Sequence, residues 1–466
     1  MTASFDQLTT ELVSAATGRA ELVAALRPPR GPVTLPSPLP VDELAVAAVG
    51  TASVAAASLA YARAAGREAD AASLGPVVLD GPRLTAAYRS EQVFTWNGER
   101  PDAWAPASGF FEAADGWVRT HGNYPHHGAA LRRMLGLGAD AGKDAIAAAL
   151  RTATAAHWED RAATEDAIVG RVRNEEEWRA HPQAHTVRAH PLVRRDVADA
   201  GSPQLPESTS PLPLAGVRVL DLTRVIAGPV ATRTLALFGD DVLRIDSPHL
   251  PEIEWQFLDT GQGKRSAVLD LADSDSRATL DALVAQADLL VTGYRPGALA
   301  RFGLDPASTR ERWPRLITAT VDAWGPGPWE QRRGFDSIVQ AVSGIAMLHG
   351  TDAGPGALPA QALDHTAGYL LAASVMSALE VRHLTGAVSH VGVSLARVAQ
   401  TLLDAPRSPA PTSTPVSDET WREQTVELAV AGGGSIRCAA PAPVCDTRPV
   451  EYRAKLIPYG SSAPAW

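Results

Sequence analysis

The middle of the chain alternates short apolar runs with longer segments of helical periodicity. We expect strands over residues 217–223, 241–246, 266–271, 288–293 and 315–321, with helical segments between them. Strands separated by helical segments are typical of βαβ units, whose strands are parallel and whose crossovers are right-handed. The pattern therefore predicts an α/β fold with a Rossmann-like, doubly wound parallel sheet, which binds ligands beyond the carboxyl ends of its strands.

A long apolar helix is expected directly after Asp364. The alternating pattern of "SHVGVSL" predicts that a strand follows this helix. Leu371, Val375 and Leu379 recur at the four-residue spacing of one helix face, and Gly386 can end such a helix. An aspartate at this position has two interpretations. It is a favoured N-cap, and it could also be a nucleophile whose negative charge the helix dipole stabilises.

Segments rich in Pro, Ser and Gly divide the chain into three parts. The N-terminal part is mainly helical, but apolar runs on either side of Asp115 and Gly116 predict a hairpin in a smaller α+β domain. The expected division is an N-terminal part over 1–198, a linker over 199–216, the Rossmann-like domain over 217–403, and a linker with a C-terminal tail over 404–466.

A faint internal repeat links the N-terminal part to the central one. The segment 45–66 followed by "GPVVLD" resembles the helix after Asp364 and its following strand. Aligning Gly66 with Gly386 places Leu44 opposite Asp364. Asp42 lies two residues before Leu44, so it can be the equivalent of Asp364, and a second catalytic carboxylate, only if the alignment contains a gap. The segment from Leu44 is uncharged, but Ala, Ser, Thr and Gly make it too weakly hydrophobic for a membrane span, which predicts a buried helix.

Charge and cysteine content exclude several functions. A net charge of −10 argues against a general nucleic-acid binder, because neutralising phosphates needs a basic surface. Cys438 and Cys445 match neither a zinc-binding spacing nor a disulfide framework. The N-terminus has polar and acidic residues where a signal peptide has a basic end and an apolar core, so a cytoplasmic protein is expected.

Two clusters could bind ligands. His121, His126 and His127 gather in "GNYPHHGAA", but no carboxylate stands beside them, so we expect a polar loop and no metal. Basic residues also recur at the predicted loops of the sheet, where planar guanidinium groups would suit the phosphates of a nucleotide-like ligand, although each alone is typical of a solvated surface. These residues are Arg224, Lys264, Arg265, Arg295 and Arg301.

The central motifs resemble the class III CoA-transferases, the family of formyl-CoA and carnitine CoA-transferases and α-methylacyl-CoA racemases. "LAGVRVLDLTRVIAGPVATRTLALFGDDVLRID", "GKRSAVLDL", "ADLLVTGYRPGALARFGL", "PRLITATVDAWGPGPWEQRRGFDSIVQAVSG" and "LDHTAGYLLAASVMSALEVRHLTG" follow that family in order over residues 212–396. The resemblance implies that Asp364 is the nucleophile and that coenzyme A is held in part by residues matching known contacts. Those residues are Ile226, Ala227, Lys264, Tyr294, Arg301 and Arg333, and the loop pattern adds Arg265.

The N-terminal part resembles the family's second half. "GFFEAADGWVRTHGNYPHHGAALRRMLGL" looks like the hairpin and helix of the family's small domain, and residues 41–90 look like a remnant of a first large domain. The order of halves is thus reversed, as in a permuted chain or a fused, partly degenerate tandem. Ordinary members form interlocked dimers, so a homodimer is compatible with the resemblance, and so is a fused chain that partly replaces the partner.

The implied reaction moves CoA from an acyl-CoA to a carboxylic acid through an aspartyl-CoA thioester on Asp364. Two alternatives stay open. An α-methylacyl-CoA racemase would resemble the chain at Asp364, but racemases carry a histidine where Phe335 stands, which leaves no obvious second base. A non-catalytic CoA-binding homologue would explain the degenerate N-terminal part.

Overall fold

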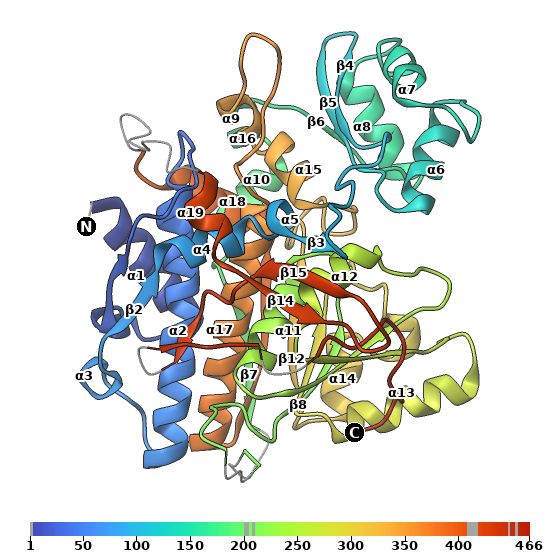
Figure 1. Ribbon diagram of the computed structural model, residues 1–466. Helices are drawn as coiled ribbons and strands as arrows, with labels where there is room; N and C mark the ends of the chain where they lie inside the picture. Colours follow the sequence, from blue (N-terminus) through green and yellow to red (C-terminus); the bar gives the residue numbers. More distant parts are fainter. Residues whose placement is uncertain (1–2, 200–204, 207–209, 408–417, 446–447, 453–454) are drawn as a thin grey trace.

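A seven-stranded sheet forms the centre of the protein, seen in the computed structural model of residues 3–199, 205–206, 210–407, 418–445, 448–452 and 455–466 (Figure 1). The strand order is β10-β9-β8-β11-β12-β13-β7, and all neighbours are parallel except β7, which runs antiparallel to β13. The strands are β7 (Arg194–Asp199), β8 (Arg218–Leu222), β9 (Asp241–Asp246), β10 (Lys264–Val268), β11 (Leu289–Thr292), β12 (Ile317–Asp322) and β13 (Ala387–Ser394).

This strand order confirms the Rossmann-like prediction. The chain runs outward from β8 through β9 to β10, and then returns to the other side of β8 to add β11, β12 and β13. The direction of strand addition reverses between β8 and β11, and such a switch point opens a crevice at the carboxyl ends of the two strands. Residues 223–226 after β8 and residues 293–295 after β11 therefore meet at the edge where a ligand is expected.

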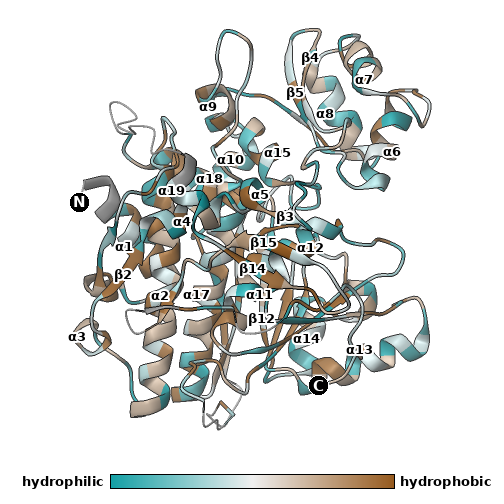
Figure 2. Cartoon of the chain, in the orientation of Figure 1, coloured by the Kyte–Doolittle hydropathy of each residue, from teal (hydrophilic) through white to brown (hydrophobic). Residues whose placement is uncertain are grey.

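Alternate residues of the strands face two different hydrophobic cores. Val219 of β8 packs in the core formed with α11 and α17, whereas Leu220 and Leu222 pack in the core formed with α13. Burial on both faces explains why these strands read as nearly continuous apolar runs. Figure 2 shows the same distribution, with apolar colour on the sheet and on helices α2 and α17 beside it.

The helices of the central part follow the predicted periodicity with one correction. The apolar segment 336–350 reads as one helix, but Gly344, with φ of +95°, divides it into two helices. A Cβ atom at Gly344 would lie 2.8 Å from the backbone nitrogen of Glu175, so only glycine permits this close approach. The helices are α11 (Ala227–Leu237), α12 (Glu254–Thr260), α13 (Ser274–Gln286), α14 (Pro306–Arg312), α15 (Asp336–Val342), α16 (Ile345–Leu348), α17 (Ala362–Thr385) and α18 (Leu395–Asp404).

The N-terminal part contributes α2 (Val41–Ala65), which packs along α17 in the main hydrophobic core (Figure 1). The residues before the two helices have nearly the same backbone angles, φ −76° and ψ 62° at Pro40 and φ −74° and ψ 62° at Gln361. Both helices end at a left-handed glycine, Gly66 and Gly386, as the pattern predicted. Helix α2 is long and apolar enough to cross a membrane, but 83% of its most apolar window is buried inside the protein.

The predicted hairpin is confirmed and belongs to a unit that stands apart from the sheet (Figure 1). We call residues 109–171 the hairpin unit. It has its own hydrophobic core, built around Val118 and Trp158. Its elements are β4 (Gly109–Ala113), β5 (Gly116–Thr120), α6 (Pro125–Met134), α7 (Lys143–Leu150), α8 (Ala155–Thr164) and β6 (Val169–Arg171).

Shorter elements complete the chain. Parts of both predicted linkers lie outside the described residues: 200–204 and 207–209 of the linker over 199–216, and 408–417 of the segment over 404–418. The elements before the hairpin unit are α1 (Ala3–Thr17), β1 (Leu26–Arg30), α3 (Ala71–Leu74), β2 (Val77–Asp80), α4 (Gly81–Tyr88), α5 (Ser90–Val93) and β3 (Thr95–Trp96). Those after it are α9 (Glu175–Arg179) and α10 (Pro182–Ala189), and those of the tail are α19 (Asp418–Arg422), β14 (Thr425–Ala429), β15 (Ser435–Ala439), β16 (Val444–Cys445) and β17 (Arg448–Pro449).

Replacing Gly368 by Ala tests the contact that seats α17 against α11. A Cβ atom there would lie 2.6 Å from the carbonyl oxygen of Ala227 and 2.8 Å from the Val230 side chain. We expect a loss of about 1–3 kcal/mol in the free energy of unfolding, because a backbone atom cannot move aside as a flexible side chain can. Urea denaturation measures the loss. Gly138→Ala is the control, since a Cβ atom there meets nothing within 4 Å, and an equal effect in both variants would contradict the contact.

Candidate active site

Asp364 is the third residue of α17 and not its N-cap, so the capping interpretation is wrong. The N-cap is Gln361, and the backbone N–H groups of Leu363 and Asp364 donate to the Asp336 carboxylate at 2.9 Å each. Asp336 therefore caps α17 from the start of α15, satisfying two N–H groups that a helix leaves without an internal partner. The carboxyl group of Asp364 is free of that task.

A second layer of hydrogen bonds fixes Asp336. The Gln340 side chain, one turn along α15, donates to the Asp336 carboxylate and accepts a hydrogen bond from the Leu358 backbone at 2.8 Å. Asp336 is fully buried. The sequence motif "RGFDSIVQ" contains both Asp336 and Gln340, but nothing in it indicated that they would reach the helix of Asp364.

Burial raises the pKa of Asp364 well above its usual range, and the nearby carboxyl groups of Asp336 and Glu91 raise it further. Only 6% of Asp364 is exposed. Burial also raises the pKa of Asp336, although its hydrogen bonds and Arg119 oppose this effect. The pKa of Glu91 rises to about 8, mainly through burial. A group of acids with strongly perturbed pKa values is typical of functional sites.

The N-terminal part supplies one wall around Asp364. The Tyr88 hydroxyl lies 3.0 Å from the Thr366 hydroxyl, and its ring packs against His365 and Tyr369 with centroids 5.3 and 6.0 Å away. Glu91 belongs to α5, directly after the α4 helix that carries Tyr88. The sequence pattern gave no sign of either residue. By contrast Asp42, the weakest carboxylate candidate, is exposed.

The loop after β8 brings Ile226 and Ala227 to the switch point, where both are buried. Val225 has φ of +71°, a conformation that a β-branched residue rarely adopts, and its N–H donates to Glu252 at 3.0 Å. Such strained positions cluster at binding sites. Gly368, one turn after Asp364, lies against Ala227, so this loop and the first turn of α17 are neighbours.

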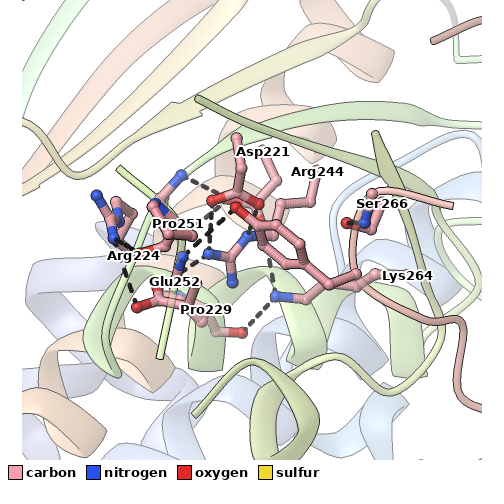
Figure 3. A network of polar contacts seen from close by, with 12 residues as sticks. Asp221, Arg224, Pro229, Arg244, Pro251, Glu252, Lys264 and Ser266 are labelled. Carbon is pink, nitrogen blue, oxygen red and sulfur yellow. Dashed lines mark hydrogen bonds and ion pairs between the residues drawn. The ribbon is translucent and has the colours of Figure 1, made fainter. Parts of the chain in front are cut away.

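Figure 3 shows the buried ion network under this loop. The Lys264 ammonium group is 3.2 Å from the Asp221 carboxylate and 2.9 Å from the Pro229 carbonyl oxygen, and Arg244 donates to Glu252 at 2.9 Å. Burial lowers the pKa of Lys264 to about 8, which Asp221 partly opposes. Lys264 therefore supports the loop from inside the sheet, whereas the motif comparison predicted a ligand contact.

The other predicted contacts are spread over the sheet edge. Tyr294 is half-buried after β11 beside Arg224, and Arg301 is exposed in a short 3-10 turn that follows. Arg333 forms an ion pair with Asp166 of the hairpin unit. Arg265 pairs with Asp241 at 2.8 Å, at the amino ends of β9 and β10. The structure thus brings Ile226, Ala227 and Tyr294 to the switch point between β8 and β11, but places Arg265 at the opposite edge of the sheet.

The three histidines of the hairpin unit lie beside the aromatic rings of Phe335 and Tyr124. The His121 ring stacks on Phe335 with centroids 3.7 Å apart, and the rings of His126 and His127 are 4.0 Å apart. Among the described residues, no group of three or more His, Cys, Asp or Glu side chains is arranged to hold a metal ion. The Tyr124 hydroxyl, in the same segment, donates a hydrogen bond to Glu252. The guanidinium carbon of Arg224 lies 4.6 Å from the centre of the Tyr124 ring.

Comparison with known proteins assigns the family. The sequence model of CoA-transferase family III matches residues 10–199 and again residues 214–428. The chain therefore belongs to CoA-transferase family III, which confirms the resemblance of its central motifs. The family model matches the N-terminal part as a segment of its own, beside the central one.

Relatives cover part of the chain. It is 33% identical over 210 residues to the probable fatty acyl-CoA transferase Rv3272 of Mycobacterium tuberculosis, covering 42% of this chain and 53% of that protein. It is 34% identical over 186 residues to a formyl-CoA:oxalate CoA-transferase of Rhodopseudomonas palustris, covering 37% and 44%. The chain thus spans about half the length of these curated relatives. A crystal structure of Rv3272 matches at 34% identity with a TM-score of 0.38, over 40% of this chain and 55% of that one.

Replacing Asp364 by Asn is expected to stabilise the protein at pH 8. The folded state holds this carboxyl group at a raised pKa, while the unfolded chain ionises it near pH 4. Ionisation therefore favours unfolding as the pH rises between the two values, and the Asn variant escapes this penalty. We expect a gain of at least about 1 kcal/mol at pH 8 that disappears near pH 4.

Urea denaturation at both pH values measures the gain. Asp140→Asn, at an exposed carboxyl group, is the matched control and should change stability at neither pH. A loss of stability in the Asp364 variant at pH 8 would show that its carboxylate is a structural anion.

Proposed function

We propose that this protein is a CoA-transferase that moves CoA from an acyl-CoA to a carboxylic acid through Asp364. The observation that carries the proposal is the position of Asp364 at the start of α17. Its carboxyl group is buried and released from capping by Asp336, and it lies one turn from the residue that contacts the β8 loop. A buried carboxyl group near the switch point, where such sheets bind ligands, suits nucleophilic catalysis with water kept away.

The proposed exchange has four steps, and each conserves charge without an external reagent. The Asp364 carboxylate attacks the thioester carbonyl carbon, which forms a mixed anhydride and releases CoA thiolate. The thiolate attacks the aspartyl carbonyl, which forms the aspartyl-CoA thioester and releases the donor as a carboxylate. The acceptor carboxylate attacks the carbonyl carbon of this thioester, which forms a second mixed anhydride and releases CoA thiolate. The thiolate then attacks the acyl carbonyl, which frees Asp364 and the new acyl-CoA.

The developing negative oxygen needs donors other than the first turn of α17, because Asp336 already occupies the N–H groups of Leu363 and Asp364. The first turn of α11 offers a second helix start beside Asp364. Its N-cap is Ile226, whose apolar side chain cannot accept a hydrogen bond. No described residue accepts a hydrogen bond from the N–H groups of Ala227 and Gly228. We assign these groups the oxyanion role.

The chain supplies wall residues that a partner subunit could otherwise provide. Helix α2 packs on α17, and Tyr88 and Glu91 of the N-terminal part reach the surroundings of Asp364. Together with the two consecutive matches to the family model, this supports a fused tandem with one active site per chain. Asp42 is exposed and the third residue of α2 is Glu43, so we assign no second nucleophile. We further propose a cytoplasmic enzyme that needs no metal, nucleic acid or membrane.

Covalent trapping tests the nucleophile. Incubation with acyl-CoA and hydroxylamine should convert Asp364 to a hydroxamate, which peptide mass spectrometry locates, because hydroxylamine intercepts the anhydride and the thioester. Asp364→Asn should give no labelled peptide, and Asp42→Asn should label as the wild type does. If the wild-type protein is not labelled, the transferase proposal fails, and the remaining interpretation is a non-catalytic CoA-binding homologue. Exchange of the α-proton of an acyl-CoA for deuterium without any CoA transfer would instead indicate a racemase.

Asp336→Asn should shift the pH dependence of labelling. The Asn oxygen can still accept from the backbone of Leu363 and Asp364, but the negative charge that raises the pKa of Asp364 is gone. The acid limb of the labelling rate should therefore move to lower pH. Rates measured from pH 4 to 9 test this, with Asp140→Asn as the control. If the acid limb does not move, Asp336 acts only through its hydrogen bonds to the α17 backbone and not through its charge.

A further inference from the structure

The hairpin unit holds a buried cation that is near the Asp336 carboxylate but forms no ion pair with it. Arg119 lies on β5 and is 9% exposed. Its guanidinium carbon is 4.6 Å from the ring centre of Trp104 and 4.8 Å from that of Phe110. No described residue forms an ion pair with this guanidinium group or accepts a hydrogen bond from it, and its Nε atom is buried without a partner.

Packing alone does not explain this arrangement. Removing a charge from water costs more than two cation–π contacts return, unless an anion or several acceptors meet the charge. Burial lowers the pKa of Arg119 to about 10, yet the group remains a cation at neutral pH. A buried guanidinium group with free donors and aromatic walls is suited to binding a carboxylate through two parallel hydrogen bonds.

Arg119 faces the proposed active site. It is close enough to Asp336 for each group to affect the pKa of the other, and Asp336 binds the backbone of Asp364. Two residues farther along the chain, His121 stacks on Phe335, the residue before Asp336. The buried Nδ1 atom of His121 has no hydrogen-bond partner among the described residues. Burial lowers the pKa of His121 to about 3, so its ring is neutral at pH 7 and can donate one hydrogen bond.

We propose that Arg119, assisted by His121, binds the non-reacting carboxylate of a dicarboxylic acid substrate. This inference rests on the proposed function, because the reacting carboxylate must attack the thioester on Asp364. Arg119 lies on the hairpin unit and Asp364 on α17, so the two carboxylates of such a substrate would contact different elements of the site. Exchange is reversible, and the same position would hold the free carboxylate of the acyl group after it has received CoA.

Ligand-dependent unfolding tests the binding without requiring turnover. Thermal unfolding is followed with CoA present and with added glutarate or valerate, two acids of equal chain length that differ by one carboxylate. Glutarate should raise the unfolding temperature of the wild type by more than valerate does, since a ligand of the folded state stabilises it. Arg119→Met should abolish the difference and should itself be at least as stable as the wild type. Arg67→Met is the matched control, because Arg67 is exposed and lies 5.1 Å from the Tyr61 ring.

Kinetics give the second readout. In Arg119→Met, the KM for glutarate as acceptor should rise at least about tenfold, with a smaller change in kcat, while the KM for valerate stays the same. Equal stabilisation of the wild type by both acids, or by neither, would overturn the proposal. So would a variant that loses stability but keeps the wild-type preference for glutarate. Failure of the proposed function would appear separately, as a wild-type protein that acyl-CoA does not label at Asp364.

Discussion

The carboxylate of Asp336 joins the two parts of the molecule on which the site depends. It closes the first turn of α17 by accepting hydrogen bonds from the backbone of Leu363 and Asp364, and it begins α15, which packs against the hairpin unit. A helix cap supplied within the same chain segment would have fixed only one helix. Because this cap comes from another helix, the position of Asp364, the start of α15 and the seat of the hairpin unit are determined together.

This arrangement gathers charge where burial makes charge costly. Asp336, Asp364 and Glu91 approach one another in the interior, and Arg119 lies beside them between aromatic rings. The surrounding protein offsets the cost through apolar packing, above all through α2 and α17, most of whose residues are buried. The main hydrophobic core of the molecule therefore surrounds a group of acids with raised pKa values.

The sequence pattern predicted the sheet well because its signals are local. Buried strands read as apolar runs, and Gly386 ends α17 as a left-handed glycine. The arrangement of the site was harder to predict from the sequence, because its contacts join residues that are distant in sequence. Asp336 and Asp364 are 28 residues apart, so their hydrogen bond has no periodic signature. Lys264 follows a glycine, which indicated a loop position. It is instead the first residue of β10, and its long side chain extends into the interior.

The pairing of α2 with α17 also changes how the protein can vary. In a symmetric dimer of identical chains, every substitution occurs on both sides of the axis, so a residue that suits one side must be tolerated on the other. Here the two helices have different sequences within one chain, and only one carries Asp364. Residues such as Tyr88 and Glu91 can therefore change to suit a single site, without a second copy of the same change elsewhere. Asymmetry of this kind lets the residues around Asp364 that come from the N-terminal part vary independently of those that come from the central part.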